Sequence, residues 1–266
     1  MRILVCVKQV PDTAEIKIDP ETNNLCRQGV PSIVNLFDLY ALETAVRLKE
    51  ANPGTDVTVL SMGPRQAETA LRQCLAAGAD DAVLVSGRVF AGSDTLATSY
   101  ALSKAIRFIE AEKGPFDLIL CGMQAIDGDT AQTGPALAEH LNYPQITCVK
   151  ELYLRDGGLR AIRETERGPE LWETPLPAVV TITKPDFEPR RPTVGAKLAA
   201  KRAVIRVLSI EDIQAEPECC GLRGSPTVVR KTFTVPPKAG RVIIQEANAH
   251  EAAAKLAAFL VKEGLV

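Results

Sequence analysis

The residues best suited to chemistry lie in one run, LILCGMQAIDGDTAQTGPALAEHL, from Leu118 to Leu141. The run begins as an apolar strand pattern, passes through a polar turn that carries two carboxylates, and ends as a helix pattern rich in small residues. In an α/β protein such a turn usually holds a phosphate, because the first turn of the following helix offers unpaired backbone N–H groups and a partial positive charge. The two carboxylates must therefore serve some other part of a ligand or the turn itself.

The turn supplies glycines that let the backbone approach a ligand, together with neutral donors: Gly122, Gln124, Gly128, Thr130, Gln132, Thr133 and Gly134. Pro135 has no N–H and belongs in the first helical turn, so the helix should begin at about Gln132 to Gly134. The helix dipole contributes about 0.3 to 2 kcal/mol to anion binding, and no lysine is required. Asp127 and Asp129 would accept hydrogen bonds from ribose hydroxyls or from loop N–H groups. We therefore predict a nucleotide with a sugar as the ligand.

Two other interpretations of the carboxylates stay open on the residues alone. Asp127 and Asp129 could simply cap a tight turn. The Asp-x-Asp pair could also hold magnesium, although no further carboxylate or P-loop lysine accompanies it.

Other segments would face the same crevice at the strand ends: Cys6 and Lys8 after the first strand, Asn35, Leu36, Phe37 and Asp38 before a helix, and Met62 after the second strand. Cys6 and Met62 are small or soft side chains suited to lining an adenine slot, although each is more often plain core. Asn35 is a candidate helix cap, with Asp38 three residues later.

The elements that position these residues follow from hydrophobic periodicity. Apolar runs at 2–7, 56–61, 82–85 and 117–121 alternate with helical patterns at 37–51, 64–78 and 93–112. The alternation predicts an α/β fold, an open parallel sheet with helices on both faces, of the Rossmann-like type that binds adenine nucleotides. A small hairpin region turns at 156–158, and residues 176–182 supply another strand.

The amino-acid composition changes toward the C-terminus, where proline and glycine become frequent after Pro185. We predict an α/β nucleotide-binding domain over residues 1–190, followed over residues 191–266 by an extended C-terminal arm that folds against something larger; the resemblance described below implies that this part is a docking segment and an arm that wraps a partner subunit. The arm ends in an amphipathic helix at about 249–262, whose apolar stripe needs a surface to cover.

Composition excludes several classes of protein. The 266 residues are 46% hydrophobic and carry a net charge of -2, so we expect a globular chain that does not bind nucleic acid. No apolar run approaches the roughly 18 residues of a membrane span, and the N-terminus reads as a strand rather than a signal peptide, so we expect a cytoplasmic protein without an intrinsic membrane segment. Seven cysteines without a CxxC pair and only two histidines give no support for a disulfide framework, a metal site or a histidine-centred mechanism.

In this order and spacing, VCVKQVPDT, NLFDLYALETAVRLKEA, VLSMGP, LAAGADDAVLV and the run from Leu118 to Leu141 closely resemble the beta subunit of electron transfer flavoproteins. The resemblance spans nearly the whole chain. It implies a heterodimer with a larger alpha subunit, which carries the electron-transferring FAD, and an adenine nucleotide in the crevice of this chain. It also implies nucleotide contacts at Cys6, Asn35 to Asp38, Met62, and Gly128 through about Glu139, a range that includes Ala131.

The family has two branches that differ in this nucleotide. In the respiratory branch it is a structural AMP, whereas in the bifurcating branch it is a second FAD that takes a hydride from NADH. AIDGDTAQTGP resembles the bifurcating type, because Gly128 and Thr130 stand where AMP-binding relatives tend to have bulkier or differently polar residues. That resemblance implies ferredoxin or flavodoxin as a low-potential acceptor, and an acyl-CoA dehydrogenase or similar flavin dehydrogenase as a further partner. NADH oxidation would then belong to the alpha/beta complex, with no side chain of this chain acting as acid, base or nucleophile.

The chain departs from the family pattern at three positions. Leu36 stands where a proline is common, Met123 replaces a frequent basic residue, and Arg167 stands where acidic residues or glycine are usual. Residues 194–204 align with the loop by which relatives dock onto acyl-CoA dehydrogenases, but they lack its dense lysine run, so an ordinary amphipathic helix is the alternative. A more distant alternative is an ATP-binding regulatory module on a related parallel sheet. An adenylating enzyme would need a glycine- and serine-rich loop after the first strand, which CVKQVPD does not provide.

Overall fold

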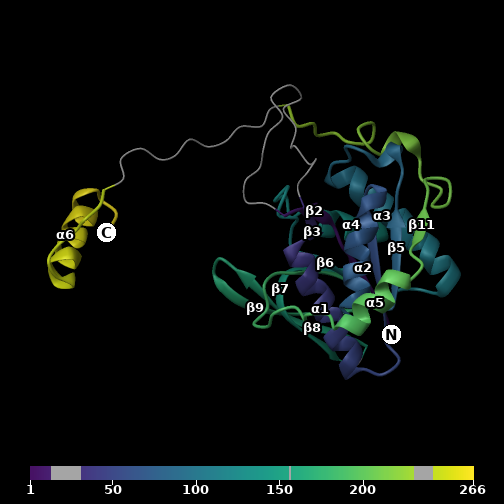
Figure 1. The fold of residues 1–266 in the computed structure, drawn as a ribbon, viewed down its shortest axis with the longest axis horizontal. Helices are drawn as coiled ribbons and strands as arrows, with labels where there is room; N and C mark the ends of the chain where they lie inside the picture. The colour runs from purple at the N-terminus through teal and green to yellow at the C-terminus, as the bar shows by residue number, and fades with distance from the viewer. Residues whose placement is uncertain (13–30, 156, 231–241) are drawn as a thin grey trace. The chain divides into compact units, whose positions relative to one another are not determined.

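The computed structural model describes residues 1–12, 31–155, 157–230 and 242–266. Asp156 of the predicted hairpin turn, Cys26, and residues 231–241 of the predicted arm lie outside this part of the chain. Among the described residues, nine strands form one sheet in the order β11-β5-β4-β1-β6-β10-β7-β8-β9. Figure 1 shows β11 at one side of this part of the chain and the long strands β8 and β9 at the other. The predicted mostly parallel α/β sheet is confirmed.

The four predicted central strands are present, and neighbours among them pair in parallel: β1 (Arg2–Cys6), β4 (Asp56–Met62), β5 (Asp81–Val85) and β6 (Leu118–Gly122). They are short runs of apolar residues because both faces of the sheet are covered. The strand predicted in LPAVVTI is β10 (Ala178–Ile182), whose five residues are all buried. It lies between β6 and β7 and is parallel to both.

Two pairs of helices cover the two faces of the sheet. One face packs against α1 (Leu36–Ala51) and α2 (Glu68–Ala76), the other against α3 (Thr95–Lys113) and α4 (Thr133–Leu141). Alternate residues of β1 point to opposite layers, with Ile3 and Val5 in one buried cluster and Leu4 in the other. Each fully buried residue of this size contributes about 1.5 to 3 kcal/mol to stability.

The helix ends follow local sequence signals. Asp94 caps α3, and its carboxylate accepts hydrogen bonds from the N–H groups of Leu96 and Ala97. A 3-10 turn, η1 (Arg65–Ala67), follows Pro64 and leads into α2, which ends shortly before Gly78. Gly78 has a φ of +120°, a conformation that favours glycine.

Beyond α4 the sheet ends in an antiparallel meander. β7 (Gln145–Arg155), β8 (Gly158–Thr165) and β9 (Gly168–Pro175) pair in sequence, which confirms the predicted hairpin region. At the opposite edge β11 (Arg206–Leu208) pairs with β5, and a separate two-stranded sheet joins β2 (Gln9–Pro11) to β3 (Ser32–Val34). These three-residue strands have no hydrophobic period and were not predicted. Two further 3-10 turns are η2 (Arg88–Phe90) and η3 (Pro217–Cys219).

The chain divides into two compact units, Met1–Arg230 and Lys231–Val266. The first unit extends past residue 190, where the sequence predicted a division, because β11 joins the sheet and α5 (Val194–Arg202) packs on α2. Arg72 of α2 fixes this packing by donating to the carbonyls of Ala200 and Ala203, at 2.8 Å and 2.9 Å.

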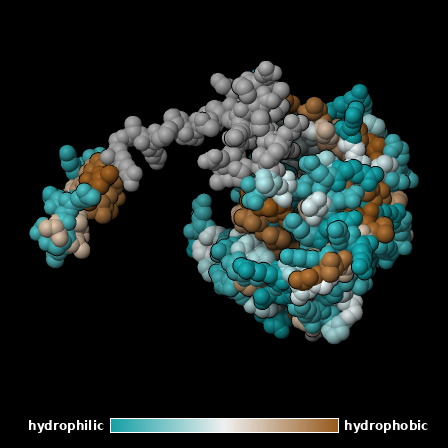
Figure 2. All heavy atoms as spheres, viewed as in Figure 1, coloured by the Kyte–Doolittle hydropathy of each residue, from teal (hydrophilic) through white to brown (hydrophobic). Residues whose placement is uncertain are grey.

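The second unit contains the predicted C-terminal helix, α6 (Ala249–Lys262). Asn248 caps it by accepting from the N–H of Glu251. No residue of α6 is buried, and apolar side chains gather along part of its surface, among them Leu256 and Val261 (Figure 2). None of the helices among the described residues is long and apolar enough to span a bilayer.

Candidate functional site

The crevice lies at the carboxyl ends of β1 and β6, where the strand order changes direction. From β1 the chain proceeds through β4 to β5 on one side of the sheet, and it then crosses to β6 on the other side of β1. Ligands bind at such a switch point in open parallel sheets, because the connecting loops diverge there. Cys6 and Cys121 stand opposite each other in register at this point. The walls are the loop after β1, the start of α1 and the turn after β6.

Asn35 ties the turn after β6 to the start of α1. Its fully buried side chain donates from Nδ2 to the Gln124 carbonyl at 2.8 Å and accepts at Oδ1 from the Ile126 N–H at 3.0 Å. Its backbone N–H donates to the Lys8 carbonyl at 2.9 Å. Asn35 does occupy the N-cap position of α1, but the predicted capping bond is absent, because both polar atoms of the side chain bind the turn.

Asp38 joins the same walls from the first turn of α1. Its Oδ2 accepts from the Lys8 N–H at 2.7 Å and its Oδ1 from the Gly122 N–H at 3.2 Å. Burial raises the pKa of Asp38 to about 7, although hydrogen bonds from Asn35, Lys8 and Gly122 favour the ionised form. This carboxyl group therefore stands near the balance between its neutral and charged forms at neutral pH.

Both carboxylates of the turn bind side chains of this chain. The Lys8 ammonium lies 2.6 Å from Asp127 Oδ1, which links the loop after β1 to the turn after β6. Gln124 donates from Nε2 to Asp129 Oδ1 at 2.9 Å. These contacts order the turn, as the turn-capping interpretation requires. Asp129 is exposed and can accept further donors.

The magnesium interpretation gains no support. Among the described residues, no group of three or more histidine, cysteine, aspartate or glutamate side chains is arranged to hold a metal ion.

The backbone of the turn is shaped for an anion. Asp129 and Ala131 have φ values of +49° and +53°, a left-handed conformation that costs a non-glycine residue about 1 to 2 kcal/mol. Gln132 follows with right-handed values, φ -103° and ψ -24°. Successive residues of opposite hand turn their N–H groups into one concavity. Helix α4 begins at Thr133, as Pro135 predicted, and its first N–H groups have no intrahelical acceptor.

Three glycines of the turn meet different surroundings. A Cβ on Gly122 would lie 2.3 Å from Asp38 Oδ1, and a Cβ on Gly134 would lie 2.4 Å from Thr181 Cγ2. Packing therefore requires glycine at both positions. A Cβ on Gly128 would meet no atom within 4 Å, so this exposed position borders open space.

The remaining predicted residues differ in exposure and in their contacts. Gln132 accepts at Oε1 from the Thr95 hydroxyl at 2.9 Å. Thr130 is exposed, Leu36 is 50% exposed, and Phe37, Met62 and Thr133 are partly buried. Contact with Cys121, together with burial, raises the pKa of the Cys6 thiol well above its usual value, so Cys6 is a neutral lining residue.

No role was predicted from the sequence for two further polar residues, Thr95 and Ser61, although the segment Ser61 to Pro64 was expected to face the crevice. Thr95 orients Gln132, and nothing in the sequence around Thr95 signals that role. Ser61 is 1% exposed, and its hydroxyl has no hydrogen-bond partner among the described residues. A serine at the end of the apolar strand DVTVLSM was the signal that could have identified it.

The arrangement fits an adenine nucleotide. Ala131 and Gln132, which have opposite hand, and the first turn of α4 can offer N–H groups to phosphate oxygens. Cys6 and Met62 are soft side chains at the ends of β1 and β4, and Gly128 borders open space.

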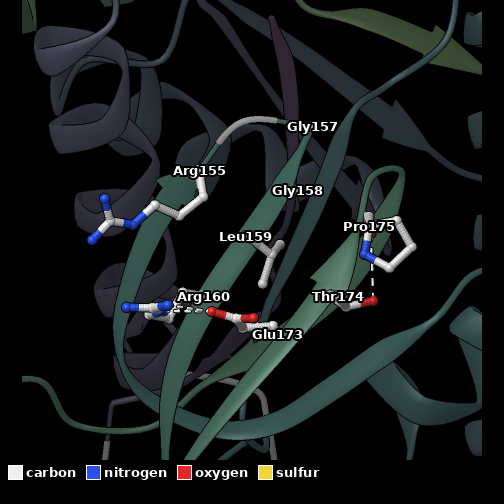
Figure 3. Close-up of a pocket in the computed structure, with 8 residues that line it drawn as sticks. All are labelled: Arg155, Gly157, Gly158, Leu159, Arg160, Glu173, Thr174 and Pro175. Carbon is white, nitrogen blue, oxygen red and sulfur yellow. Dashed lines mark hydrogen bonds and ion pairs between the residues drawn. The ribbon is translucent and has the colours of Figure 1, made fainter.

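A second hollow lies on the β-meander. It is lined by Arg155, Gly157, Gly158, Leu159, Arg160, Glu173, Thr174 and Pro175, and the Arg160–Glu173 ion pair lies along it (Figure 3). It shares no residue with the crevice and is open to solvent.

Comparison with known proteins identifies the family of this chain. The electron transfer flavoprotein domain family matches residues 22–213. The electron transfer flavoprotein subunit beta of Megasphaera elsdenii is 49% identical over 255 residues, which cover 95% of this chain and 94% of that protein. Subunit CarD of the caffeyl-CoA reductase-Etf complex of Acetobacterium woodii is 45% identical over 266 residues, 100% of both chains. Protein FixA of Bradyrhizobium diazoefficiens is 45% identical over 267 residues, 99% of this chain and 92% of that protein. The chain belongs to the electron transfer flavoprotein family, among its beta subunits.

Proposed function

We propose that this chain binds FAD in the crevice and, in a cytoplasmic complex with an alpha subunit, oxidises NADH and divides the electrons between two acceptors. One acceptor is ferredoxin or flavodoxin, and the other is the FAD of the alpha subunit, which feeds an acyl-CoA dehydrogenase or similar flavin enzyme. The open space at Gly128, beside the anion cradle, carries the proposal. FAD needs that space for its pyrophosphate and second half, whereas AMP does not. The similarity to a subunit of a caffeyl-CoA reductase-Etf complex supports a partner that acts on CoA esters.

The chain's own residues bind and orient. When bound, the flavin supplies the hydride acceptance and single-electron release. The N–H groups at residues 131–134 and the dipole of α4 would hold the pyrophosphate. The Lys8–Asp127 ion pair joins two walls of the crevice, and Asn35 holds the turn that contains the cradle.

Substitution of Gly128 tests the choice of nucleotide. In the alpha/beta complex, Gly128→Leu should fill the open space, lower the FAD content of this subunit at least tenfold and abolish bleaching of its flavin by NADH. Gly195→Leu is a matched control, because a Cβ on Gly195 also meets no atom within 4 Å and Gly195 lies on α5. Full FAD occupancy in Gly128→Leu would contradict the proposal.

Helix α5 is the proposed docking segment for the dehydrogenase. Val194 and Leu198 are 76% and 55% exposed, and Lys197 and Lys201 are exposed beside them. Charge reversal at both lysines should weaken reduction of the dehydrogenase and leave NADH oxidation intact. Lys104→Glu on α3 is the control, and unchanged transfer in the α5 variant would favour an ordinary surface helix.

The C-terminal arm is proposed to pack against the alpha subunit. Residues 242–266 expose the apolar side chains of Val242, Ile243, Leu256, Val261 and Leu265, and exposed apolar surface of this kind is typical of a protein–protein interface. Truncation after Arg230 should leave the first unit folded, because that unit has its own core, but should weaken the heterodimer. Sedimentation of the truncated chain with its partner measures this, and unchanged association would refute the role.

A further inference from the structure

The carboxyl group of Asp38 reaches both walls of the crevice from inside the protein. Asp38 is 6% exposed, and each of its oxygens accepts a backbone N–H from a different wall. Lys8 lies where the chain leaves β1, and Gly122 is the last residue of β6. The carboxyl group of Asp38 therefore bridges these two segments just beyond Cys6 and Cys121, the last residues that pair between β1 and β6.

The residues around the Asp38 carboxylate are closely packed. Asp38 Oδ1 lies so close to Gly122 that only glycine can occupy position 122. Loss of either bond would leave a backbone N–H without its acceptor, which is unfavourable in a part-buried site. The bonds come from backbone groups, so Asp38 acts on the path of the chain on both sides of the crevice.

The geometry points to Asp38 as a positioning residue: its carboxylate holds the loop after β1 and the turn after β6 at the separation that the bound nucleotide requires, and it does so without touching the nucleotide. This inference rests on the proposed nucleotide-binding function and adds a pH dependence to it.

The groups that face Asp38 explain why its charge responds near neutral pH. Burial raises its pKa to about 7, while hydrogen bonds from Asn35, Lys8 and Gly122 and the positive charge of Lys8 oppose the rise. The thiols of Cys6 on β1 and Cys74 on α2 also face it. Their pKa values are raised, by the Cys121 contact and burial at Cys6 and by burial at Cys74, so both stay neutral.

The sign of the effect follows from the raised pKa. Below about pH 7 the carboxyl carries a proton, and one oxygen becomes an O–H donor that faces an N–H. The contribution of this group to folding stability is present at low pH and is lost as the pH rises through about 7. The two backbone bonds show the opposite trend and are complete only above about pH 7. Nucleotide affinity should therefore rise with pH while this group's contribution to stability falls.

The test compares FAD affinity between pH 6 and pH 8.5 in full chains purified with an alpha subunit that retains its own FAD. FAD is the probe because its pyrophosphate does not titrate in this range. Wild type should bind FAD about tenfold more tightly at pH 8.5, from loss of the charge-assisted bonds at low pH. Asp38→Asn should bind weakly at both pH values, with a ratio near one. Glu43→Gln is the matched control, a buried carboxylate of the same helix that binds Arg190 instead of the crevice walls.

Each outcome decides the matter. The positioning role would be overturned if Asp38→Asn bound FAD with the affinity and pH profile of wild type. It would also be overturned if Glu43→Gln lost as much FAD affinity as Asp38→Asn. In both cases the proposed FAD binding by wild type would still stand. Failure of wild type to bind FAD at every pH would overturn the proposed function and this inference with it. If Asp38→Asn does not fold, hydrogen exchange in wild type decides: the protection of the Lys8 and Gly122 amides, corrected for intrinsic rates, should rise through pH 7, and constant protection would refute the role.

Discussion

Replacing Asn35 with alanine removes two hydrogen bonds from the wall of the crevice. The Gln124 carbonyl loses a donor at 2.8 Å, and the Ile126 N–H loses an acceptor at 3.0 Å. Each buried polar group left without a partner costs about 1 to 3 kcal/mol. Because both bonds are part-buried, each loss lies between about 0.5 and 3 kcal/mol, and Asn35→Ala should lower the free energy of unfolding by about 1 to 6 kcal/mol, out of the roughly 5 to 15 kcal/mol of an ordinary domain.

Urea unfolding followed by circular dichroism measures this loss, and FAD titration of the alpha/beta complex measures its effect on the crevice. Asn52→Ala is the control, because Asn52 at the other end of α1 donates to the Leu48 carbonyl at 2.8 Å. That single, partly exposed bond is worth about 0.5 to 1.5 kcal/mol. The control should lose a little stability and keep its FAD affinity.

The reasoning about Asn35 fails in either of two cases. Equal urea midpoints for Asn35→Ala and wild type would mean that the two bonds contribute nothing net. A large loss of stability with unchanged FAD affinity would mean that the turn they hold is not part of the nucleotide site.

Two further predictions concern packing and charge. Gly122→Ala should prevent stable folding or nucleotide binding, because the added Cβ would lie 2.3 Å from the Asp38 carboxylate at the start of α1. Gly128→Ala is the control and should fold like wild type, because its added Cβ meets no atom within 4 Å. Soluble yield and the urea midpoint of each variant check both expectations, and a stable Gly122→Ala variant that binds the nucleotide would contradict the packing. Arg190→Ala should cost about 1 to 3 kcal/mol at pH 7, because buried Glu43 loses one of its two arginine partners. Burial opposes ionisation of Glu43, but its bonds to Arg190 and Arg47 hold its pKa below the usual value. The difference in unfolding free energy between Arg190→Ala and wild type should therefore vanish as the pH falls through that lowered pKa. Equal urea midpoints for the two proteins at pH 7 would refute this prediction.

Much of the fold could be predicted from the sequence, because the central strands and the helix starts depend on local sequence signals. β1, β4, β5 and β6 are short apolar runs, and a residue without an N–H, Pro135, located the start of α4. The cap of α3 has a local cause of the same kind, because Asp94 accepts from residues two and three positions further along the chain. Structural features with local causes can be predicted from a single sequence.

The features that could not be predicted depend on contacts between residues that are far apart in the sequence. Asn35 looks like a helix cap from its neighbours, but its side chain binds residues 89 and 91 positions along the chain. The role of Asp38 depends in the same way on Gly122. β11 has three residues and no period, and it is a strand because it pairs with β5. Contacts between sequence-distant segments at the crevice were therefore beyond pattern reasoning.

The most direct measurement of the central claim is the nucleotide content of the complex. The chain would be co-expressed with its alpha subunit, the purified heterodimer denatured, and the released nucleotides identified and counted. We predict two FAD and no AMP per heterodimer, with one flavin in the crevice between Lys8 and Gly134. One FAD and one AMP would contradict the account, because the open space at Gly128 would then serve no flavin.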